Sequence, residues 1–309
     1  MTMTVKIIDP HLHLFAREIG DYHWLKSDHP PFWPDKILIQ RNFTINDLAI
    51  QPSMELGGFV HIEAGFDNQQ PWRELEFLEA LESEQTLPLP MRTIGTVNLL
   101  EANTLFKDKL KKQQAFRSLV GVRHILDEQA FDILTEQNAQ KNLAYLNTIE
   151  GFIFELQLAL SDELSAKVMP ILLKTITENS QLTFILNHAG FPPHDLKAAA
   201  WKTWQDNIAQ LAKRPNVFIK CSGMEMIDRK FSMQAFEQVL KHCLAEFSLP
   251  RIMLASNFPL CLLSGKSYVS YWQGILECEL IQKSNKQQKS ALLYDNALRI
   301  YQLNSVKLT

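Results

Sequence analysis

The sequence lacks the features of secreted, membrane-spanning and nucleic-acid-binding proteins. Its 309 residues include only four cysteines, and no two of these form a C-x-x-C pair, which argues against a zinc ribbon or a thiol redox motif. There is no polybasic tract, and 31 Lys and Arg stand against 34 Asp and Glu, so the net charge is −3. No apolar stretch of about 18 residues occurs, and none follows a basic N-terminus as in a signal peptide.

These absences predict a cytoplasmic protein with free thiols that acts on a small molecule, without a nucleic-acid or membrane partner. The remaining composition is that of an ordinary globular protein, with 46% hydrophobic and 21% charged residues. No low-complexity linker or change in composition divides the chain. We therefore expect a single domain over residues 1–309.

Eight short apolar runs occur along the chain, and most are separated by amphipathic stretches of helical length. Near-continuous apolar runs of this kind are typical of parallel strands that are covered on both faces. Eight strand–helix repeats predict an α/β fold, a (β/α)8 barrel of the TIM type, whereas a doubly wound sheet would seldom need so many units. The predicted strands cover residues 5–13, 56–65, 91–99, 119–126, 151–158, 182–190, 216–224 and 251–259.

Amphipathic periodicity marks the clearest helices. Ser161, with Glu163 and Leu164 behind it, indicates the start of one of them. The last is expected to close the fold. These helices are predicted at 72–84, 161–178, 232–247 and 286–301.

The segment that follows the first strand, about 14–43, is unusually long for a loop. Its aromatic residues predict an ordered cover over the barrel mouth or, alternatively, an anchor that ties the loop to the barrel rim. These residues are Tyr22, Trp24, Phe32 and Trp33.

Polar side chains stand at the end of every predicted strand. Buried polar groups cost free energy unless they are paired, and the active sites of (β/α)8 barrels lie at the carboxyl ends of the strands. The pattern therefore predicts a site at this end of the barrel. Its candidates, in strand order, are Asp9, His11 and His13; His61 and Glu63; Asn98; Arg123 and His124; Glu155 and Gln157; Asn187 and His188; Lys220 and Ser222; and Ser256 and Asn257.

The histidines sharpen this prediction. Because residues i and i+2 of a strand share a face, we expect Asp9, His11 and His13 to point one way. Two imidazoles one pleat apart can both reach a metal between them or one polarised substrate oxygen, and imidazole suits zinc and similar divalent ions. With His188 on the sixth strand, the set is a candidate site for a metal or a carbonyl group.

Taken in order, the motifs resemble those of the amidohydrolase-related TIM-barrel hydrolases of the "amidohydrolase 2" type. Within this group the chain is most similar to the branch of the sugar lactonases and the 2-pyrone-4,6-dicarboxylate lactonases. The resemblance spans nearly the whole chain. It rests on IIDPHLHLF at 7–15, YHWL at 22–25, HIEAG at 61–65, GVRHIL at 121–126, NHAGFP at 187–192, IKCSGM at 219–224, SNFPLC at 256–261 and NALRIY at 296–301.

The resemblance implies a hydrolase that attacks a small cyclic ester, a lactone, with water in the barrel mouth. His11, His13 and His188 match positions that bind a divalent metal, zinc or manganese, in some members and the substrate carbonyl in metal-independent lactonases. Arg123 matches a residue that contacts an anionic or hydroxylated substrate. Glu63 is a further candidate for the catalytic set. The resemblance leaves open whether the protein is a monomer or a homo-oligomer.

Four more residues are candidate substrate contacts, because they lie at strand ends or on the first loop: Trp24, His61, His124 and Glu155. His61 is expected to share a strand face with Glu63.

Two of the carboxylates have an alternative role. Asp9 is equally well interpreted as the partner of a histidine. Glu155 is equally well interpreted as the ion-pair partner of Lys220 or Arg123.

The chain departs from the family at two carboxylates. The family usually reads Gly-Ser-Asp-Trp-Pro where this chain reads Ala-Ser-Asn-Phe-Pro, so Asn257 replaces the aspartate that activates water. An amide cannot take a proton from water, and removal of a general base typically costs about 10²–10⁴ in rate. The sixth strand ends Asn187-His188 where the family commonly has Asp-His. With fewer anions, a divalent metal is expected to be held weakly or to be absent.

Three functions stay open on the sequence. The first is a lactone hydrolase in which another carboxylate such as Glu63, or a weakly held metal, activates water. The second is a degenerate barrel that binds a small ligand without turnover, because Asn257 has replaced the base. The third, a decarboxylase, has the least support, since decarboxylases of the wider group usually use a metal with the same histidines and aspartate.

Overall fold

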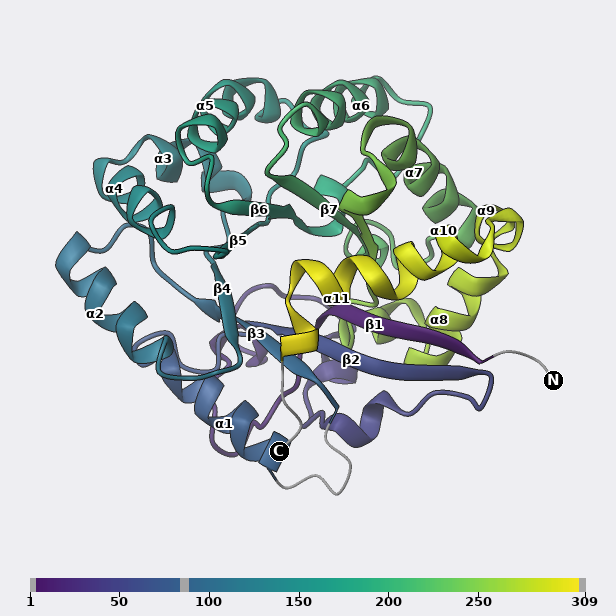
Figure 1. The fold of residues 1–309 in the computed structure, drawn as a ribbon, viewed down its shortest axis with the longest axis horizontal. Helices are drawn as coiled ribbons and strands as arrows, with labels where there is room; N and C mark the ends of the chain where they lie inside the picture. Colours follow the sequence, from purple (N-terminus) through teal and green to yellow (C-terminus); the bar gives the residue numbers. More distant parts are fainter. Residues whose placement is uncertain (1–3, 84–88, 306–309) are drawn as a thin grey trace.

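Eight parallel strands form a barrel that is ringed by helices (Figure 1). The computed structural model describes residues 4–83 and 89–305. The strands are hydrogen-bonded in sequence order, each to the next, as in a (β/α)8 barrel and not a doubly wound sheet. The predicted fold is confirmed. The strands are β1 (Val5–Leu12), β2 (Met54–Ile62), β3 (Met91–Thr96), β4 (Leu119–Arg123), β5 (Ile153–Leu156), β6 (Thr183–Leu186), β7 (Val217–Cys221) and β8 (Ile252–Leu254).

All eight strands end earlier than predicted, because the last residues of each predicted run belong to turns and loops. The helix predicted at 232–247 is α7, whose N-cap Ser232 accepts a hydrogen bond from the Ala235 amide. The helix predicted from Ser161 begins at Ser165 instead, where the Asp162 carboxylate accepts the Ser165 N–H at 2.9 Å. Residue 84, the predicted end of the first helix, lies outside the described residues.

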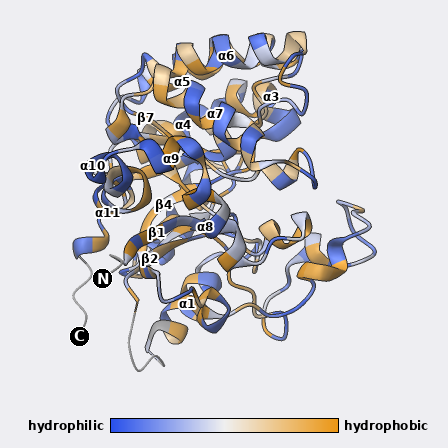
Figure 2. Ribbon diagram, turned by 90° about the vertical axis from the view of Figure 1, so that its right-hand side faces the viewer, coloured by the Kyte–Doolittle hydropathy of each residue, from blue (hydrophilic) through white to orange (hydrophobic). Residues whose placement is uncertain are grey.

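Helices lie between most successive strands and cover the outside of the barrel. Their bounds are α1 (Trp72–Ser83), α2 (Asn103–Gln113), α3 (Ala130–Thr135), α4 (Gln137–Leu146), α5 (Ser165–Glu178), α6 (Ala199–Ala212), α7 (Met233–Glu246), α8 (Tyr268–Glu277), α9 (Glu279–Lys283), α10 (Lys286–Ser290) and α11 (Asn296–Ile300). Hydrophobic and hydrophilic residues alternate along them, as α6 shows in Figure 2. In α6, Trp204, Ile208 and Leu211 are buried at a spacing of three or four residues, which places them on one side of the helix.

Burial of each apolar side chain of this size stabilises the fold by about 1.5–3 kcal/mol. The four cysteines are also buried and carry free thiols, as predicted. Among the helices of the described ranges, none is long and apolar enough to cross a membrane.

An apolar layer fills the barrel at the amino ends of the strands. The closing segment, predicted as one helix, consists of α10, a π-helical turn (Ala291–Asp295) and α11. It packs Ala297, Ile300 and Tyr301 against this layer and closes that end of the barrel (Figure 1). The opposite, polar end is left for the site. The strand residues of the layer are Ile8, Val60, Ile62, Ile94, Val120, Ile153, Ile185 and Met253.

The barrel closes between β1 and the turn after β8. Leu12 and Phe258 form a single parallel bridge there. The backbone N–H of Asn257 donates to the carbonyl of His11 at 2.9 Å, and the N–H of His13 donates to the carbonyl of Phe258 at 2.7 Å. The seam therefore fixes three predicted site residues, from opposite ends of the sequence, beside one another.

The long first loop is ordered around one buried lysine. The Lys36 ammonium donates to the backbone carbonyls of Trp24, Lys26 and His29 at 2.9, 3.0 and 2.7 Å. These bonds tie together a segment whose regular structure consists of short 3-10 turns at His23–Leu25, Lys36–Ile39 and Ile45–Leu48.

The aromatic residues of this loop have different places. Trp24 and Trp33 line the cavity described below. Tyr22 is buried, and its hydroxyl accepts the Ala16 N–H at 3.0 Å. Phe32 is 72% exposed, so its predicted part in the cover is wrong. Two of the aromatics therefore cover the cavity, and one anchors the loop.

Candidate active site

A cavity of about 1080 Å³ lies at the carboxyl ends of the strands, where barrel enzymes bind their substrates. Most of the predicted site residues line it. The others are fully buried and lie outside its lining: Asp9, His11, His61, Glu155, Asn187, Lys220, Ser222 and Ser256. The predicted residues that line the cavity are His13, Trp24, Glu63, Asn98, Arg123, His124, Gln157, His188 and Asn257.

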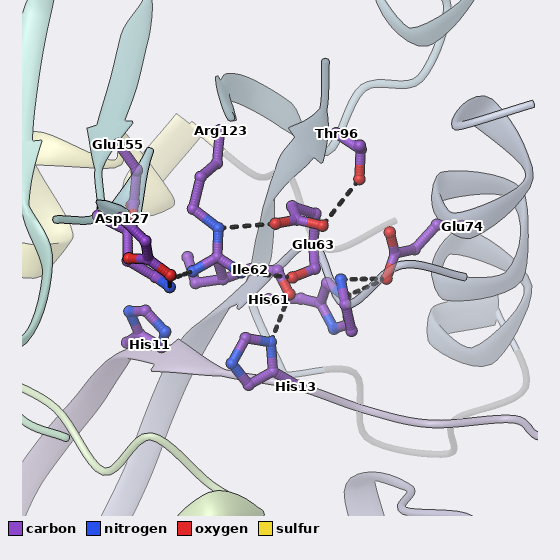
Figure 3. Close-up of polar contacts among 12 residues, drawn as sticks. His11, His13, His61, Ile62, Glu63, Glu74, Thr96, Arg123, Asp127 and Glu155 are labelled. Atoms are coloured by element: carbon purple, nitrogen blue, oxygen red, sulfur yellow. Dashed lines mark hydrogen bonds and ion pairs between the residues drawn. The ribbon is translucent and has the colours of Figure 1, made fainter. Parts of the chain in front are cut away.

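Arg123, the last residue of β4, is held by an ion pair with Glu63, which follows β2 (Figure 3). Its Nε donates to Glu63 Oε1 at 2.7 Å, its Nη2 to the Glu63 carbonyl at 2.8 Å, and its Nη1 to Gln157 Oε1 at 2.8 Å. Thr96 donates to the second carboxylate oxygen at 2.9 Å. Burial raises the pKa of Glu63, but the charge and hydrogen bond of Arg123 outweigh it and hold the pKa below its ordinary value. Both carboxylate oxygens are therefore engaged.

His13 presents an unprotonated ring nitrogen. Its Nδ1 lies 2.7 Å from the carbonyl oxygen of Ile62 (Figure 3). Because a carbonyl only accepts, Nδ1 carries the ring proton, and Nε2 keeps its lone pair. Burial, followed by the charge of Arg123, lowers the pKa of His13 to about 3. The ring is thus neutral at neutral pH and acts as an acceptor.

His11 is the donor counterpart of His13. Its ring centroid lies 5.2 Å from that of His13 and 4.6 Å from that of His188. The Lys220 ammonium lies 3.4 Å from His11 Nδ1 and can only donate, so the proton of neutral His11 is on Nε2. That nitrogen is buried and has no hydrogen-bond partner within the described residues. An unpaired buried donor calls for an acceptor from a ligand or water.

A buried ion pair supports His11. Lys220 on β7 donates to both oxygens of Glu155 on β5 at 2.6 and 2.7 Å, and the Tyr301 hydroxyl donates to the same carboxylate at 2.6 Å. Burial lowers the pKa of Lys220 to about 8, although Glu155 opposes the shift. The ion pair predicted for Glu155 is confirmed. Its predicted substrate contact is not supported, because its oxygens are engaged away from the cavity.

His61 faces away from the cavity, which does not support its predicted contact with a substrate. The inner layer takes Val60 and Ile62 from β2, so the alternation of the strand turns His61 outward. There its Nε2 donates to Glu74 Oε1 of α1 at 3.0 Å (Figure 3), and its Nδ1 accepts the Leu14 N–H at 3.2 Å. Burial raises the pKa of Glu74 well above its ordinary value. The sequence did not reveal Glu74, because an acid on an amphipathic helix normally indicates a solvated side.

Asp9 does not point the same way as His11 and His13. A register shift between Asp9 and Leu12 interrupts the two-residue alternation of β1. Asp9 instead accepts hydrogen bonds from the Ser256 hydroxyl at 2.5 Å and from the backbone N–H groups of Ser256 and His11 at 3.1 and 3.2 Å. Burial raises the pKa of Asp9 to about 6. This carboxyl group joins β1 to the residues after β8, which agrees with a supporting role.

His188 follows β6 in a left-handed turn, where the strand was predicted to continue. Its φ is 54°, and that of Ala189 is 50°. The ring reaches the loop after β7, where Nδ1 lies 3.0 Å from Ser222 Oγ. A Cβ at Gly223 would lie 2.3 Å from this nitrogen, so the close approach requires glycine. Burial, followed by the charge of Arg123, holds the pKa of His188 well below its ordinary value, so this ring is neutral too.

Trp24 and His124 line other parts of the cavity. The Trp24 indole donates to the Ala64 carbonyl at 2.7 Å, and His124 Nδ1 accepts the Leu99 N–H at 3.1 Å. Each side chain is thereby fixed by one backbone hydrogen bond and presents part of its surface to the cavity.

Asn257 lines the cavity and is bonded to a residue that the sequence did not single out. Its Nδ2 donates to Glu225 Oε1 at 2.6 Å. Glu225 is fully buried in the 3-10 turn Met224–Met226, and burial raises its pKa to about 7. The strand-end pattern missed Glu225, because it lies in the loop beyond the end of β7.

The predicted metal ligands do not form a metal site in this arrangement. Within residues 4–83 and 89–305, no group of three His, Cys, Asp or Glu side chains is placed to hold a metal ion. His11 carries its proton on the nitrogen that would have to bind, and the Lys220 ammonium occupies the other nitrogen. A divalent cation would also meet the charges of Lys220 and Arg123, whose carboxylate partners Glu155 and Glu63 are already engaged in ion pairs. The residues as placed therefore do not fit zinc or manganese.

Comparison with known proteins identifies one family over most of the chain. A family model described as amidohydrolase matches residues 8–303. The curated but uncharacterized protein y4mH of Sinorhizobium fredii is 26% identical over 307 residues, which are 97% of this chain and 99% of that protein.

Solved structures share the fold at lower identity. An amidohydrolase from Burkholderia multivorans with bound HEPES is 21% identical, with a TM-score of 0.77 over 96% of this chain and 99% of that one. A second structure of an amidohydrolase from that organism, with bound zinc, has a TM-score of 0.75 and the same identity and coverage. A candidate 2-pyrone-4,6-dicarboxylic acid hydrolase from Pseudomonas putida is 19% identical, with a TM-score of 0.64 over 97% and 99% of the two chains. At these identities the likeness concerns the fold.

The buried ion pair yields a stability prediction. Lys220→Met leaves the Glu155 carboxylate uncompensated in the barrel, so we expect a loss of about 3–5 kcal/mol in the free energy of unfolding. Adding Glu155→Gln removes the stranded charge and recovers most of the loss. Urea unfolding measures both, with the exposed pair Lys174–Glu178 as control, where Lys174→Met changes little. Equal losses for the two lysine variants would contradict the prediction.

Glu225 yields a prediction on pH. Its folded pKa of about 7 lies above the ordinary value of 4.5, so between these values the folded chain keeps a proton that the unfolded chain releases. Stability contributed by this group therefore falls as pH rises from about 4.5 to 7. Relative to Glu225→Gln, the wild type is expected to lose on the order of 3 kcal/mol across this window. Denaturant unfolding of both proteins at several pH values checks this, and a pH-independent difference between them would refute it.

Proposed function

The chain belongs to the amidohydrolase family, and on this premise we propose that it is an enzyme that hydrolyses a small, uncharged, hydroxylated lactone in the cavity at the barrel mouth. The observation that carries the proposal is an acceptor histidine in the cavity wall, His13, with a donor histidine, His11, packed behind the wall against His13 and His188. His11 offers an unpaired N–H, and His13 offers a free lone pair.

The charges of the cavity wall favour an uncharged substrate. Lys109 is paired with Glu101 at 2.6 Å, and Arg123 is paired with Glu63 at 2.7 Å. A substrate carboxylate would need an uncompensated Arg or Lys, which the lining does not offer. The lining carboxylates in fact outnumber the lining cations, with Glu63, Glu101, Asp127 and Glu128 against Lys109 and Arg123.

Neutral side chains on the same wall suit a hydroxylated ring. Amide groups both donate and accept hydrogen bonds, as hydroxyl groups require, and aromatic faces pack against the apolar side of a ring. The lining provides both kinds in Asn68, Gln69, Asn98, Gln157, Trp24 and Trp33. This combination supports a sugar-type lactone over a dicarboxylate.

In the proposed reaction, the oxygen of a water molecule attacks the carbonyl carbon, the ring C–O bond breaks, and an open-chain hydroxy acid forms. His11 Nε2–H donates to the carbonyl oxygen, on which negative charge develops. His13 Nε2 accepts the proton from the water and returns it to the ring oxygen that leaves. Arg123, held rigidly by Glu63 and Gln157, fixes the substrate beside them.

His13 takes the role of base in this proposal because neither Asn257 nor Glu63, the two residues that the sequence suggested for that role, is free to take a proton. Asn257 is an amide and cannot take a proton. Both oxygens of Glu63 are bonded, and its pKa is held low. The pKa of about 3 for His13 makes it a weak base, so the proposed enzyme turns over slowly.

A second candidate is a barrel that binds the same class of ligand without turnover. The observation that favours it is Asn257, which leaves the turn after β8 without a base. Binding of a hydroxylated lactone, measured by calorimetry, with no release of acid would support this candidate over the enzyme.

The hydrolase is tested with a panel of lactones. We expect the wild type to open a neutral substrate such as D-glucono-1,5-lactone or L-galactono-1,4-lactone and to leave 2-pyrone-4,6-dicarboxylate untouched, as followed by acid release. His13→Ala is expected to lower kcat about 10²-fold or more, because it removes the acceptor of the water proton. His194→Ala, on a 70% exposed side chain, is the control. Absence of turnover across the panel, or preference for the dicarboxylate, would count against the proposal.

The proposed reaction does not depend on a divalent metal. Dialysis of the purified protein against a strong chelator is expected to leave kcat unchanged, and added zinc or manganese is expected not to raise it, since the Lys220 ammonium lies against His11 and the proposed steps use only protein groups. Elemental analysis of the same samples gives the metal content. Loss of activity on chelation, with recovery on adding one equivalent of an ion, would overturn this expectation.

A further inference from the structure

Asn257 is fixed by its backbone. It lies in the left-handed region, with φ of 57°, a conformation that Asn and Asp adopt more readily than most other residues with a side chain. Its N–H donates to the His11 carbonyl at 2.9 Å, and its own carbonyl accepts the Leu260 N–H at 2.8 Å. The position of its side chain between the cavity and the loop after β7 is therefore set by the fold, and an aspartate could occupy the same backbone.

The Asn257 amide has one end paired and one end open. Nδ2 donates to Glu225 Oε1 at 2.6 Å, whereas Oδ1 is buried and has no partner in the part of the chain that the structure describes. Above its pKa of about 7, Glu225 is a carboxylate that only accepts hydrogen bonds, so it selects the donor end of the amide. The acceptor end is left for the cavity, which Asn257 lines and Glu225 does not.

Glu225 also accounts for the amide at position 257. The nearby Arg229 donates to the backbone carbonyl of Glu225, and Glu225 Oε2 is buried with no partner among the described residues. The Asn257 amide is thus the side chain that donates a hydrogen bond to the buried carboxylate of Glu225. An aspartate in its place would set two carboxyl groups within hydrogen-bond distance, and two such groups cannot both ionise.

We propose that Glu225 is a positioning residue that acts through Asn257, holding its amide so that Oδ1 faces the cavity and accepts a hydrogen bond from the attacking water. The negative charge at this corner of the site is therefore carried by Glu225 and not by residue 257. The identity of the water rests on the proposed lactone hydrolysis, whereas the pairing of the two side chains does not.

A double-mutant cycle at about pH 8 tests the pairing. Asn257→Asp is expected to lower the melting temperature by roughly 5 °C or more, because it sets a second carboxylate against Glu225. Combining it with Glu225→Gln is expected to abolish most of this loss, since the glutamine amide donates to the aspartate. Asn98→Asp is the matched control. It introduces the same negative charge at another cavity position, after β3. The melting temperature is expected to change by the same amount with and without Glu225→Gln.

Kinetics on the neutral lactone test the role. Glu225→Met removes the acceptor and frees the Asn257 amide to turn, so kcat is expected to fall about 10–100-fold while KM stays nearly constant. Glu225→Gln keeps an acceptor oxygen on a side chain of the same length, so its kcat is expected to stay within about threefold of the wild-type value. A contribution to folding alone would lower the melting temperature without separating kcat from KM in this way.

The outcomes separate this proposal from the proposed function. If Asn257→Asp lowers the melting temperature equally with and without Glu225→Gln, the pairing is overturned. If the wild type and Glu225→Met have equal kcat values, the positioning role is overturned. A wild type that opens no lactone would refute the proposed hydrolysis and, with it, the role in holding water. The melting-temperature cycle would still decide the pairing, because it needs no activity.

Discussion

The site depends on the buried ion pair between Lys220 and Glu155. Because both groups are fully buried, neither charge can exist there without the other. The pair sets the proton of His11 on Nε2, through the contact of Lys220 with Nδ1, and it joins the barrel to the closing helix through the Tyr301 hydroxyl. The donor that the proposed chemistry needs is thus a consequence of charge neutralisation one layer deeper in the barrel.

The same requirement governs the rest of the barrel mouth. Each buried acid meets a specific partner: Glu63 meets Arg123, Glu74 meets His61, and Glu225 meets Asn257. The cations of the cavity wall are also paired, Arg123 with Glu63 and Lys109 with Glu101, which is why the cavity favours an uncharged substrate. The pairing with Glu225 also explains why residue 257 is an amide, because an aspartate there would place a second carboxylate against Glu225.

Much of this site could be predicted from strand periodicity alone. His13, Arg123, His188 and Asn257 line the cavity as expected, because parallel strands bring their carboxyl ends to one end of a barrel. The predicted orientation of His61 was wrong. Its apolar neighbours Val60 and Ile62 pack inside the barrel, so the strand alternation points the histidine outward. Glu225 was missed because it lies in a turn, where no periodicity applies.

The sequence by itself determined the barrel, the strand order and the end at which the polar residues gather, because these follow from local patterns of a few residues. The tertiary structure alone decided which polar groups pair. His11 and Lys220 are 209 residues apart, and Glu155 and Tyr301 are 146 apart. Hydrogen-bond partners at such separations are chosen by the closure of the barrel. The proton position of His11 and the open end of the Asn257 amide were therefore beyond any local pattern.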